Sequence, residues 1–371
     1  MASTLPEDRI ARRLKWYREQ RGLTQQQVAV AMGFNDRQTL AAIEASDRRI
    51  SPRELVQAAA IVGIDLDDLL DPFRLVGEGE FSFRASSEAT PELIDSFAAS
   101  AGRWIATYRE LARQAGVEPL PLSHKLDIRV DSSFELVQAS AESIWKQWKL
   151  GKVPAQRLEE AITRELDVLV LHVDAPKAIS GAASQLPGLK TILVNRRESR
   201  GRRMYDLAHE LFHILTWDAM PPSRVEPQRI KPTKGNRVEQ LANNFAAALL
   251  MPEPVVTAEW RRRGELDVAS WVLMTAKVLC VSPDALQWRL VNLQKITKAA
   301  IKRLVEMHDA GTDHVPELFS RAFVALVQQA VDAGRLSLRR AASLLDLSVV
   351  AFAELCQVYD LPLSYEVPAR I

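Results

Sequence analysis

Cysteine, net charge and long apolar runs are all scarce in this chain. Only Cys280 and Cys356 occur in 371 residues. Both lie within apolar helical patterns, so we expect buried free thiols in a reducing compartment and no disulfide framework. The chain has 48 Lys and Arg against 47 Asp and Glu, a formal net charge of +1. This balance excludes a global field that would draw the chain onto nucleic acid or membrane, so any such binding must be local.

No window reaches the uninterrupted apolar length of a membrane span, and residues 1–8 lack a basic-then-apolar signal pattern. We therefore expect a cytoplasmic protein. The 47% of hydrophobic residues can supply ordinary cores, and the length allows two or three domains.

A candidate catalytic helix spans residues 204–216. Its apolar residues recur at helical spacing, which predicts one buried face: Met204, Leu207, Ala208, Leu211 and Leu215. His209 and His213 lie one turn apart and can direct their nitrogens at one Zn²⁺, while Glu210 can take a proton from a metal-bound water. Such a site needs a third protein ligand and keeps its fourth position for water.

A second helical pattern supplies that ligand. Residues 238–251 carry an apolar stripe, and Pro252 ends the helix. Glu239 flanks the stripe, so we expect His209, His213 and Glu239 to bind the metal. Asn243, one turn further on, could fix a ligand imidazole through its ring N–H.

A bare His-Glu-x-x-His can arise by chance on a polar helix face, but the two segments together resemble the ImmA/IrrE family of zinc metallopeptidases. The resemblance rests on Ala208–His213, on Glu239–Pro252 and on the strand-like Thr191–Asn195, and Glu239 follows His213 by 26 residues. One departure is Phe212, where the family commonly has Gly, and we expect it to alter packing more than metal binding. The resemblance implies Zn²⁺, with Mn²⁺ as the alternative, and cleavage of intracellular regulators.

Residues 8–71 predict a compact five-helix unit. Thr24 with Gln27 forms a capping box, Ser51-Pro52-Arg53-Glu54 starts another helix, and glycines end the helices between. The unit resembles the XRE/Cro-type helix-turn-helix domain, on Arg21-Gly22-Leu23-Thr24-Gln25, the Gly33 turn and Ile43-Glu44. Ser46 stands where that family usually has Gly.

The resemblance places the third helix, about Asp36 to Ser46, in the major groove of double-stranded DNA. It nominates Arg37, Gln38 and Ala42 as base-reading positions, with Gln25 near phosphate or base. The first helix is basic between Arg9 and Arg21. It could lie along phosphates or be an ordinary exposed face, and binding in two copies would favour a homodimer.

The remaining segments complete a mainly α fold with a small α+β peptidase domain. Residues 73–90, which include Gly77 and Gly79, predict a linker, and residues 91–116 predict a bridging helix. Strands are expected at Val168–Val173, Ile179–Ala183 and Thr191–Val194, with His172 as a strand histidine rather than a ligand. We divide the chain into residues 1–75 (helix-turn-helix), 76–125 (linker and bridging helix), 126–255 (metallopeptidase) and 256–371 (helical C-terminal region). Residues 334–362 look like a second helix-turn-helix element, for which helical packing or dimer contact is at least as good an interpretation. The arginines between 196 and 203 are interpreted as a solvated loop rather than a receptor for acidic substrate.

Together these patterns predict a cytoplasmic, DNA-binding zinc metalloendopeptidase that cleaves a helix-turn-helix repressor or antitoxin, in a stress or mobile-element setting. The alternative is a non-proteolytic regulator or antitoxin-like binder that uses the peptidase fold as a sensor. Intact ligands and an intact Glu210 favour the enzyme.

Overall fold

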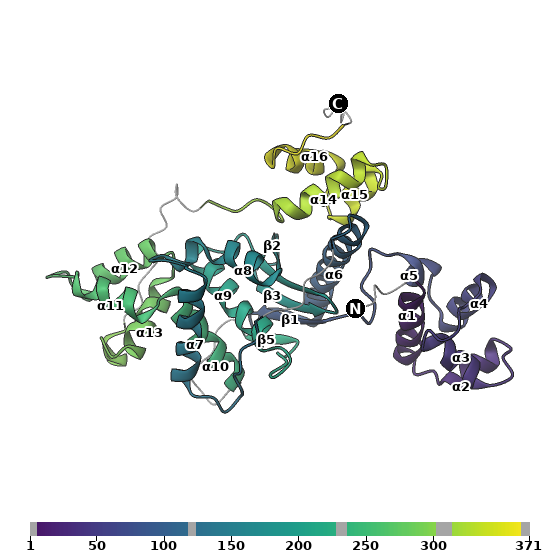
Figure 1. Ribbon diagram of the computed structural model, residues 1–371, viewed down its shortest axis with the longest axis horizontal. Coiled ribbons are helices and arrows are strands. Elements are labelled where there is room, and N and C mark those ends of the chain that lie inside the picture. The colour runs from purple at the N-terminus through teal and green to yellow at the C-terminus, as the bar shows by residue number, and fades with distance from the viewer. Residues whose placement is uncertain (1–5, 118–123, 228–235, 302–313, 365–371) are drawn as a thin grey trace.

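The computed structural model describes residues 6–117, 124–227, 236–301 and 314–364. Figure 1 shows the N-terminal helices as a unit to one side of a central sheet with its helices, and the last helices as a further lobe beside the long helix α6. Predicted helices and observed helices agree over most of the chain.

The N-terminal unit has the five predicted helices: α1 Pro6–Gln20, α2 Gln25–Ala31, α3 Arg37–Glu44, α4 Pro52–Val62 and α5 Leu66–Leu70. The capping boxes at Thr24 and Ser51 are both formed, and Gly63 ends α4 in the left-handed conformation at φ 72°. The small core of this unit is made of residues such as Leu14, Leu40 and Val62.

A five-stranded sheet forms the centre of the molecule, in the order β2-β4-β3-β1-β5. The strands are β1 Glu80–Ala85, β2 Leu169–Val173, β3 Ile179–Leu186, β4 Leu189–Asn195 and β5 Val225–Pro227. β3 is antiparallel to both β4 and β1, whereas β2 pairs with β4 and β5 pairs with β1 in parallel. The short β5 is therefore an edge strand beside β1.

Alternation along the strands divides the apolar residues between two cores. Leu169 and Leu171 of β2 enter one core, while Val168 and Val170 enter the other. The first face is covered by α6 Pro91–Gln114 and by α14 Arg321–Asp332, α15 Leu338–Leu344 and α16 Val349–Val358. The sheet thus lies in a middle layer, and the C-terminal helix-turn-helix-like element packs into this core.

The second face is covered by further helices, including the two that carry the predicted metal ligands. They are α7 Phe134–Gln147, α8 Leu158–Leu166, α9 Arg200–Thr216 and α10 Arg237–Leu250, followed by α11 Glu253–Arg261, α12 Val268–Leu279 and α13 Pro283–Asn292. Two 3-10 turns occur at Pro154–Gln156 and Lys298–Ala300. Because α11–α13 join this core, the boundary predicted at residue 255 cuts through one packed unit.

The prediction of a linker over residues 73–90 is wrong, because β1 runs through its middle. Gly77 and Gly79, which suggested flexibility, have φ values of 60° and 88° and allow close packing. A Cβ on Gly77 would lie 2.4 Å from Trp16 Cδ1, and one on Gly79 would lie 2.8 Å from Leu186 Cγ. Glycine is required at both positions because Trp16 and Leu186 approach the backbone too closely to leave room for a Cβ.

Two arginines of the basic helix α1, Arg9 and Arg13, are engaged in contacts within the chain. Arg13 is fully buried and donates to backbone carbonyls at the end of α5, including that of Asp71 at 2.8 Å and that of Arg74 at 2.6 Å. Arg9 pairs with Glu110 of α6 at 3.3 Å. Arg9 and Arg13 therefore form neither an ordinary exposed face nor a phosphate-binding face. They hold the helix-turn-helix unit against α6 and the chain before β1.

Several of the arginines entering α9 make contacts within the chain, so the interpretation as a solvated loop does not hold for the buried Arg203, whereas Arg197 is 69% exposed. Arg203 is buried and donates to the carbonyls of Arg196 at 3.2 Å and His314 at 3.0 Å. Arg196 and Arg197 both pair with Asp174 at 2.8 Å. The pairs with Asp174 join the β2–β3 connection to the β4–α9 connection.

The predictions for the two cysteines and for His172 are confirmed. Cys280 and Cys356 are buried free thiols. His172 is a strand histidine whose Nε2 lies 2.9 Å from Glu159 Oε2. Within the described ranges no single helix is long and apolar enough to cross a membrane, although the bent pairs α12 with α13 and α15 with α16 meet that test by length and composition.

Candidate metal centre and helix-turn-helix

Helix α9 carries His209, Glu210 and His213 and is buried on almost every side. Its residues from Arg203 to Thr216 are all buried except Tyr205. Gly181 of β3 faces α9: a Cβ there would lie 3.9 Å from Glu210 Cγ, an ordinary contact distance, and 3.0 Å from the Leu193 carbonyl oxygen of the neighbouring strand β4. The sheet therefore packs directly against the Glu210 side of α9.

Helix α10 contacts α9 at two places, through Tyr205 at one end and through Phe212 at the other. The Tyr205 hydroxyl lies 3.1 Å from the carbonyl oxygen of Asn243 and 3.2 Å from its Oδ1. The rings of Phe212 and Phe245 pack with centroids 5.5 Å apart, and both are fully buried. Phe212, the departure from the family pattern, thus fills the space between the two helices.

The predicted contact between Asn243 and a ligand imidazole is not formed. The Asn243 side chain donates instead to the carbonyl oxygen of Glu239 at 2.8 Å, in addition to its contact with Tyr205. Neither His209 Nδ1 nor His213 Nδ1 has a hydrogen-bond partner among the described residues. Asn243 positions the backbone of α10 rather than a ring.

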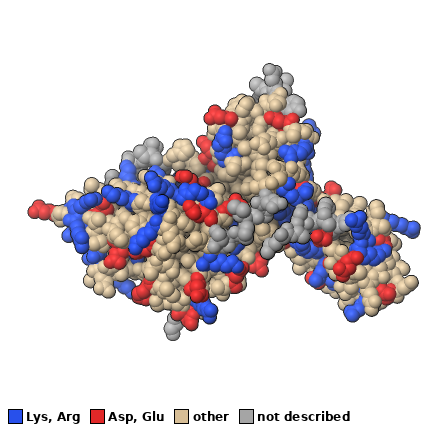
Figure 2. All heavy atoms as spheres, viewed as in Figure 1, with Lys and Arg blue, Asp and Glu red and all other residues tan. Residues whose placement is uncertain are grey.

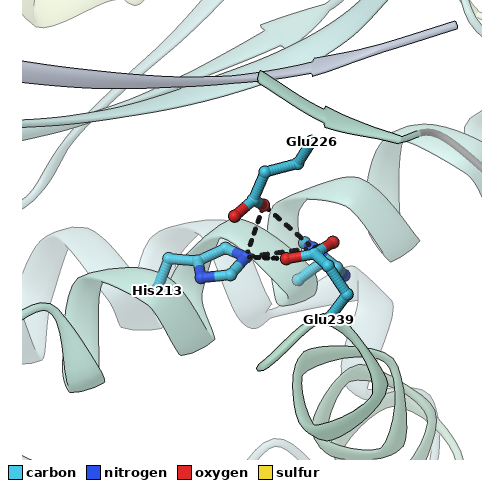
Figure 3. Close-up of side chains that lie close together, drawn as sticks. His213, Glu226 and Glu239 are labelled. Atoms are coloured by element: carbon cyan, nitrogen blue, oxygen red, sulfur yellow. Dashed lines mark hydrogen bonds and ion pairs between the residues drawn. The ribbon is translucent and has the colours of Figure 1, made fainter. Parts of the chain in front are cut away.

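Four buried side chains converge at the cluster, as Figure 3 shows for three of them. The Nε2 atoms of His209 and His213 are 3.1 Å apart. Glu239 Oε2 lies 3.3 Å from His209 Nε2, and Glu239 Oε1 lies 3.4 Å from His213 Nε2. The three residues that the sequence nominates as ligands are therefore brought together.

The fourth member, Glu226 of β5, is a residue that sequence reasoning missed. Its Oε2 lies 2.9 Å from His213 Nε2 and 3.9 Å from His209 Nε2. It is 1% exposed, and the other three cluster residues are fully buried. Glu226 lies in a polar, proline-containing segment with no helical or alternating pattern, so nothing in the sequence marks it.

The donor set fits a divalent metal. Ligand bonds of about 2.1 Å in a tetrahedron separate neighbouring donor atoms by about 3.4 Å, close to the distances among His209, His213 and Glu239. Two imidazoles with carboxylates suit Zn²⁺, and the same set accepts Mn²⁺. Buried carboxylates are otherwise costly: in the described part of the chain neither oxygen of Glu210 has a hydrogen-bond partner, and Glu226 and Glu239 have the imidazoles of His209 and His213 as their polar neighbours at the cluster.

Electrostatics lead to the same conclusion. Burial raises the pKa of Glu210 to about 7, although the His209 and His213 imidazoles lower it. Burial lowers the pKa of His213, but hydrogen bonds to Glu226 and Glu239 outweigh it and raise that pKa to about 10. Burial raises the pKa of Glu239, and the imidazoles outweigh it and hold that pKa well below its usual range. Nearby positive charge stabilises these buried carboxylates, and a bound divalent cation would provide it.

Arg84 and Asp206 form a buried ion pair beside this cluster. Arg84 Nε on β1 lies 3.1 Å from Asp206 Oδ1 on α9, and Arg202 Nε lies 3.3 Å from Asp206 Oδ2. Burial lowers the pKa of Arg84, but Asp206 and Glu210 outweigh it and raise that pKa. The pair fixes α9 against β1, and sequence reasoning missed it because its members are 122 positions apart.

In the N-terminal unit, Arg37 and Gln38 are exposed on the first turn of α3, and Ala42 is partly exposed one turn later. Gln25 is partly buried, and its Nε2 donates to Glu44 Oε2 at 2.9 Å. Glu44 also forms a buried ion pair with Arg18. Gln25 therefore ties the start of α2 to the end of α3, while Arg37 and Gln38 remain accessible.

Charged side chains of both signs are interspersed over the face drawn in Figure 2. This agrees with the net charge of +1 and leaves recognition to particular side chains rather than to a field over the whole molecule.

Comparisons with known proteins recover the same two regions. Residues 163–290 match the family of IrrE N-terminal-like domains, and residues 14–69 match that of helix-turn-helix domains. No curated protein matches the chain.

Among solved structures, the apo form of ComR from S. thermophilus is 10% identical, with 96% of each chain covered and a TM-score of 0.17. Bacillus thuringiensis PlcR in complex with the peptide PapR7 and DNA is 9% identical, with 95% of this chain and 93% of that chain covered and a TM-score of 0.17. Scores this low do not indicate a shared arrangement over the whole chain. The two family matches do agree with the architecture seen here: the chain joins an XRE-type helix-turn-helix domain to an IrrE N-terminal-like domain of a metallopeptidase family.

Proposed function

We propose that this protein is a cytoplasmic, DNA-binding zinc metalloendopeptidase that cleaves an intracellular regulator, such as a helix-turn-helix repressor or antitoxin, to control transcription. The observation that carries the proposal is the buried convergence of His209, His213 and Glu239 within the IrrE N-terminal-like region, with Glu210 between the two histidines.

His209, His213 and Glu239 would hold the metal, through two ring nitrogens and a carboxylate. When bound, Zn²⁺ would polarise a peptide carbonyl and lower the pKa of a nearby water. Glu210 would accept the proton of the attacking water and deliver it to the leaving amine.

The helix-turn-helix domain supports the DNA-binding half of the proposal. Arg37 can bridge the acceptors of guanine, and Gln38 can pair with adenine, when α3 enters the major groove. Ala42 and Gln25 would lie at the same surface. A single domain of this kind makes few phosphate contacts, so we propose that a homodimer reads two half-sites.

Metal analysis with matched variants tests the peptidase. The full chain and Glu210→Gln should carry Zn²⁺, whereas Glu239→Ala should bind it more weakly, because the site loses a direct carboxylate ligand. Co-expression with each small regulator encoded beside the gene should shorten one of them on a gel with the native chain and leave it intact with Glu210→Gln. An unchanged Zn²⁺ affinity in Glu239→Ala would remove Glu239 from the ligand set.

DNA binding is tested by gel shift with the protein's own promoter region at low salt. Arg37→Ala and Gln38→Ala should each weaken specific binding by about 1–3 kcal/mol, roughly 5- to 150-fold. Arg53→Ala is the matched control, because Arg53 is an exposed arginine of the same domain on α4. Equal losses in all three variants would mean that α3 does not read bases.

One observation favours the second candidate, a non-proteolytic regulator that uses the metal centre as a sensor. Glu226 lies at 2.9 Å from His213 Nε2, in the space that a catalytic water would need. A regulator of this kind would keep metal and DNA binding in the Glu210→Gln variant and would cleave nothing in either form.

A further inference from the structure

The carboxylate of Glu226 has no role in the proposed peptidase chemistry, yet it lies at the cluster as closely as the nominated ligands do. Its distance of 2.9 Å to His213 Nε2 is shorter than either distance from Glu239 to the imidazoles, and all four donor atoms lie within 4.8 Å of one another. Such an arrangement contains a donor for each corner of a tetrahedron.

The backbone that delivers Glu226 is fixed to the sheet. β5 pairs in parallel with β1, with Arg84 opposite Glu226 and Phe83 opposite Val225. The Phe83 amide donates to the carbonyl oxygen of Arg224 at 2.9 Å. The strand pairing therefore fixes the backbone of Glu226 and the direction from which its side chain enters the cluster.

The attachment of β5 is short, however. Three residues pair with β1, and Val225 is 44% exposed. The ion pair that anchors the strand, Arg224 with Asp95, has side chains that are 63% and 62% exposed. Exposed pairs of this kind contribute about 0.2–1 kcal/mol, so apart from the contact that Glu226 itself makes, β5 is held to β1 weakly compared with a core strand.

We propose that Glu226 is a fourth protein ligand that completes a His209–His213–Glu239–Glu226 metal site, and that β5 thereby holds the peptidase in a closed state. This proposal rests on the proposed function. With four protein donors, the position that a water or a peptide carbonyl requires is filled by the chain itself. Departure of β5 opens that position and at the same time exposes the hydrogen-bonding edge of β1 beside the metal.

The exposed edge defines the class of substrate. An unpaired strand edge binds an extended peptide through main-chain hydrogen bonds, so the segment that replaces β5 is an extended stretch of a protein. In the closed state, β5 lies where that peptide would bind, and the Glu226 carboxylate fills the position that a water or the peptide carbonyl requires.

The proposal is tested with the full-length chain loaded with Co²⁺, whose visible absorption reports coordination, and with azide as a probe of an open position. The native protein should give a four-coordinate spectrum that azide changes only weakly. Glu226→Gln should bind azide readily. Loss of a residue that only hydrogen-bonds to a metal ligand lowers metal affinity roughly 10–100-fold. Glu226→Gln removes a direct ligand, so its Zn²⁺ affinity should fall by at least this factor.

Two further variants make the test specific. Glu80→Gln changes a carboxylate on β1 that accepts from Trp217 at 3.0 Å, and it should behave like the native chain. Arg224→Ala leaves Glu226 intact and loosens β5, so the apparent azide affinity should rise by up to about fivefold. This second variant keeps the test decisive if Glu226→Gln folds poorly.

The outcomes separate this inference from the proposed function. Equal azide binding and equal Zn²⁺ affinity in the native chain and Glu226→Gln would overturn the fourth ligand and leave the peptidase untouched. Failure of the native chain to bind any metal would overturn both. If Glu226→Gln opens the site to azide but neither form cleaves denatured casein or a neighbouring regulator, the closed site stands and the peptidase proposal falls.

Discussion

Replacing Glu44 by alanine tests whether one buried ion pair holds α2 and α3 in their DNA-reading arrangement. Glu44 ends α3 and receives Arg18 Nε at 2.6 Å and Arg18 Nη2 at 2.9 Å, and Gln25 Nε2 donates to it at 2.9 Å. The Arg18 and Glu44 side chains are only 8% and 2% exposed. The substitution removes three hydrogen bonds and leaves a buried guanidinium with the Leu23 carbonyl, at 2.9 Å, as its principal partner.

Removing one partner of a buried pair costs about 3–5 kcal/mol. A domain of roughly 60 residues has a total free energy of unfolding of about 3–9 kcal/mol. Glu44→Ala should therefore consume most of the stability of the helix-turn-helix unit. Loss of DNA binding should follow even though Glu44 does not face the groove.

Hydrogen exchange followed by mass spectrometry measures this in the full chain. Peptides from α2 and α3 should exchange about 100-fold faster or more in Glu44→Ala, while peptides from α9 and α10 keep their rates. Glu19→Ala is the matched control, because Glu19 pairs with the same guanidinium at 3.2 Å but is 51% exposed, and its loss should cost less than about 1 kcal/mol. Equal exchange in the two variants would refute the reasoning.

Three further predictions concern stability. Ser46 adopts φ 65°, so Ser46→Gly should stabilise the helix-turn-helix unit by about 0.5–1 kcal/mol, measured by the same exchange experiment. Gly201→Ala should destabilise the metal-centre core by about 1–3 kcal/mol in thermal melts, because its Cβ would lie 2.7 Å from backbone at the α12–α13 junction. Burial raises the pKa of Asp174, but hydrogen bonds from Arg197 and Arg196 outweigh it and lower that pKa from 3.8 to about 2. Native Asp174 should therefore be more stabilising than Asn by about 1 kcal/mol above pH 4, with the difference vanishing in melts as the pH falls towards 2.

Local patterns in the sequence predict the helices of the site well. The spacing of apolar residues in α9 and α10 depends only on the helical repeat, and so does the placement of His209 and His213 one turn apart. The caps at Thr24 and Ser51 are similarly local, because a side chain there satisfies amides three residues away.

Features that depend on distant partners could not be predicted in this way. Glu226 becomes a cluster member only because β5 pairs with β1, and no pattern within three residues can specify that pairing. Gly77 and Gly79 suggested a linker, since glycine gives the same sequence signal for flexibility and for close packing. The arginines of α1 were compatible with phosphate contacts or with an ordinary exposed face, but the partners of Arg9 and Arg13 lie in α5, α6 and the chain before β1.

Zinc K-edge absorption spectroscopy of the full-length protein tests the central claim most directly, because it reports which atoms surround the metal. We predict nitrogen and oxygen neighbours at about 2.0–2.1 Å, the outer-shell signature of two imidazoles, and loss of that signature in a His209→Ala, His213→Ala double variant. A sulfur shell near about 2.3 Å, which would implicate a cysteine, or an unchanged spectrum in the double variant would contradict a metal centre built on α9 and α10.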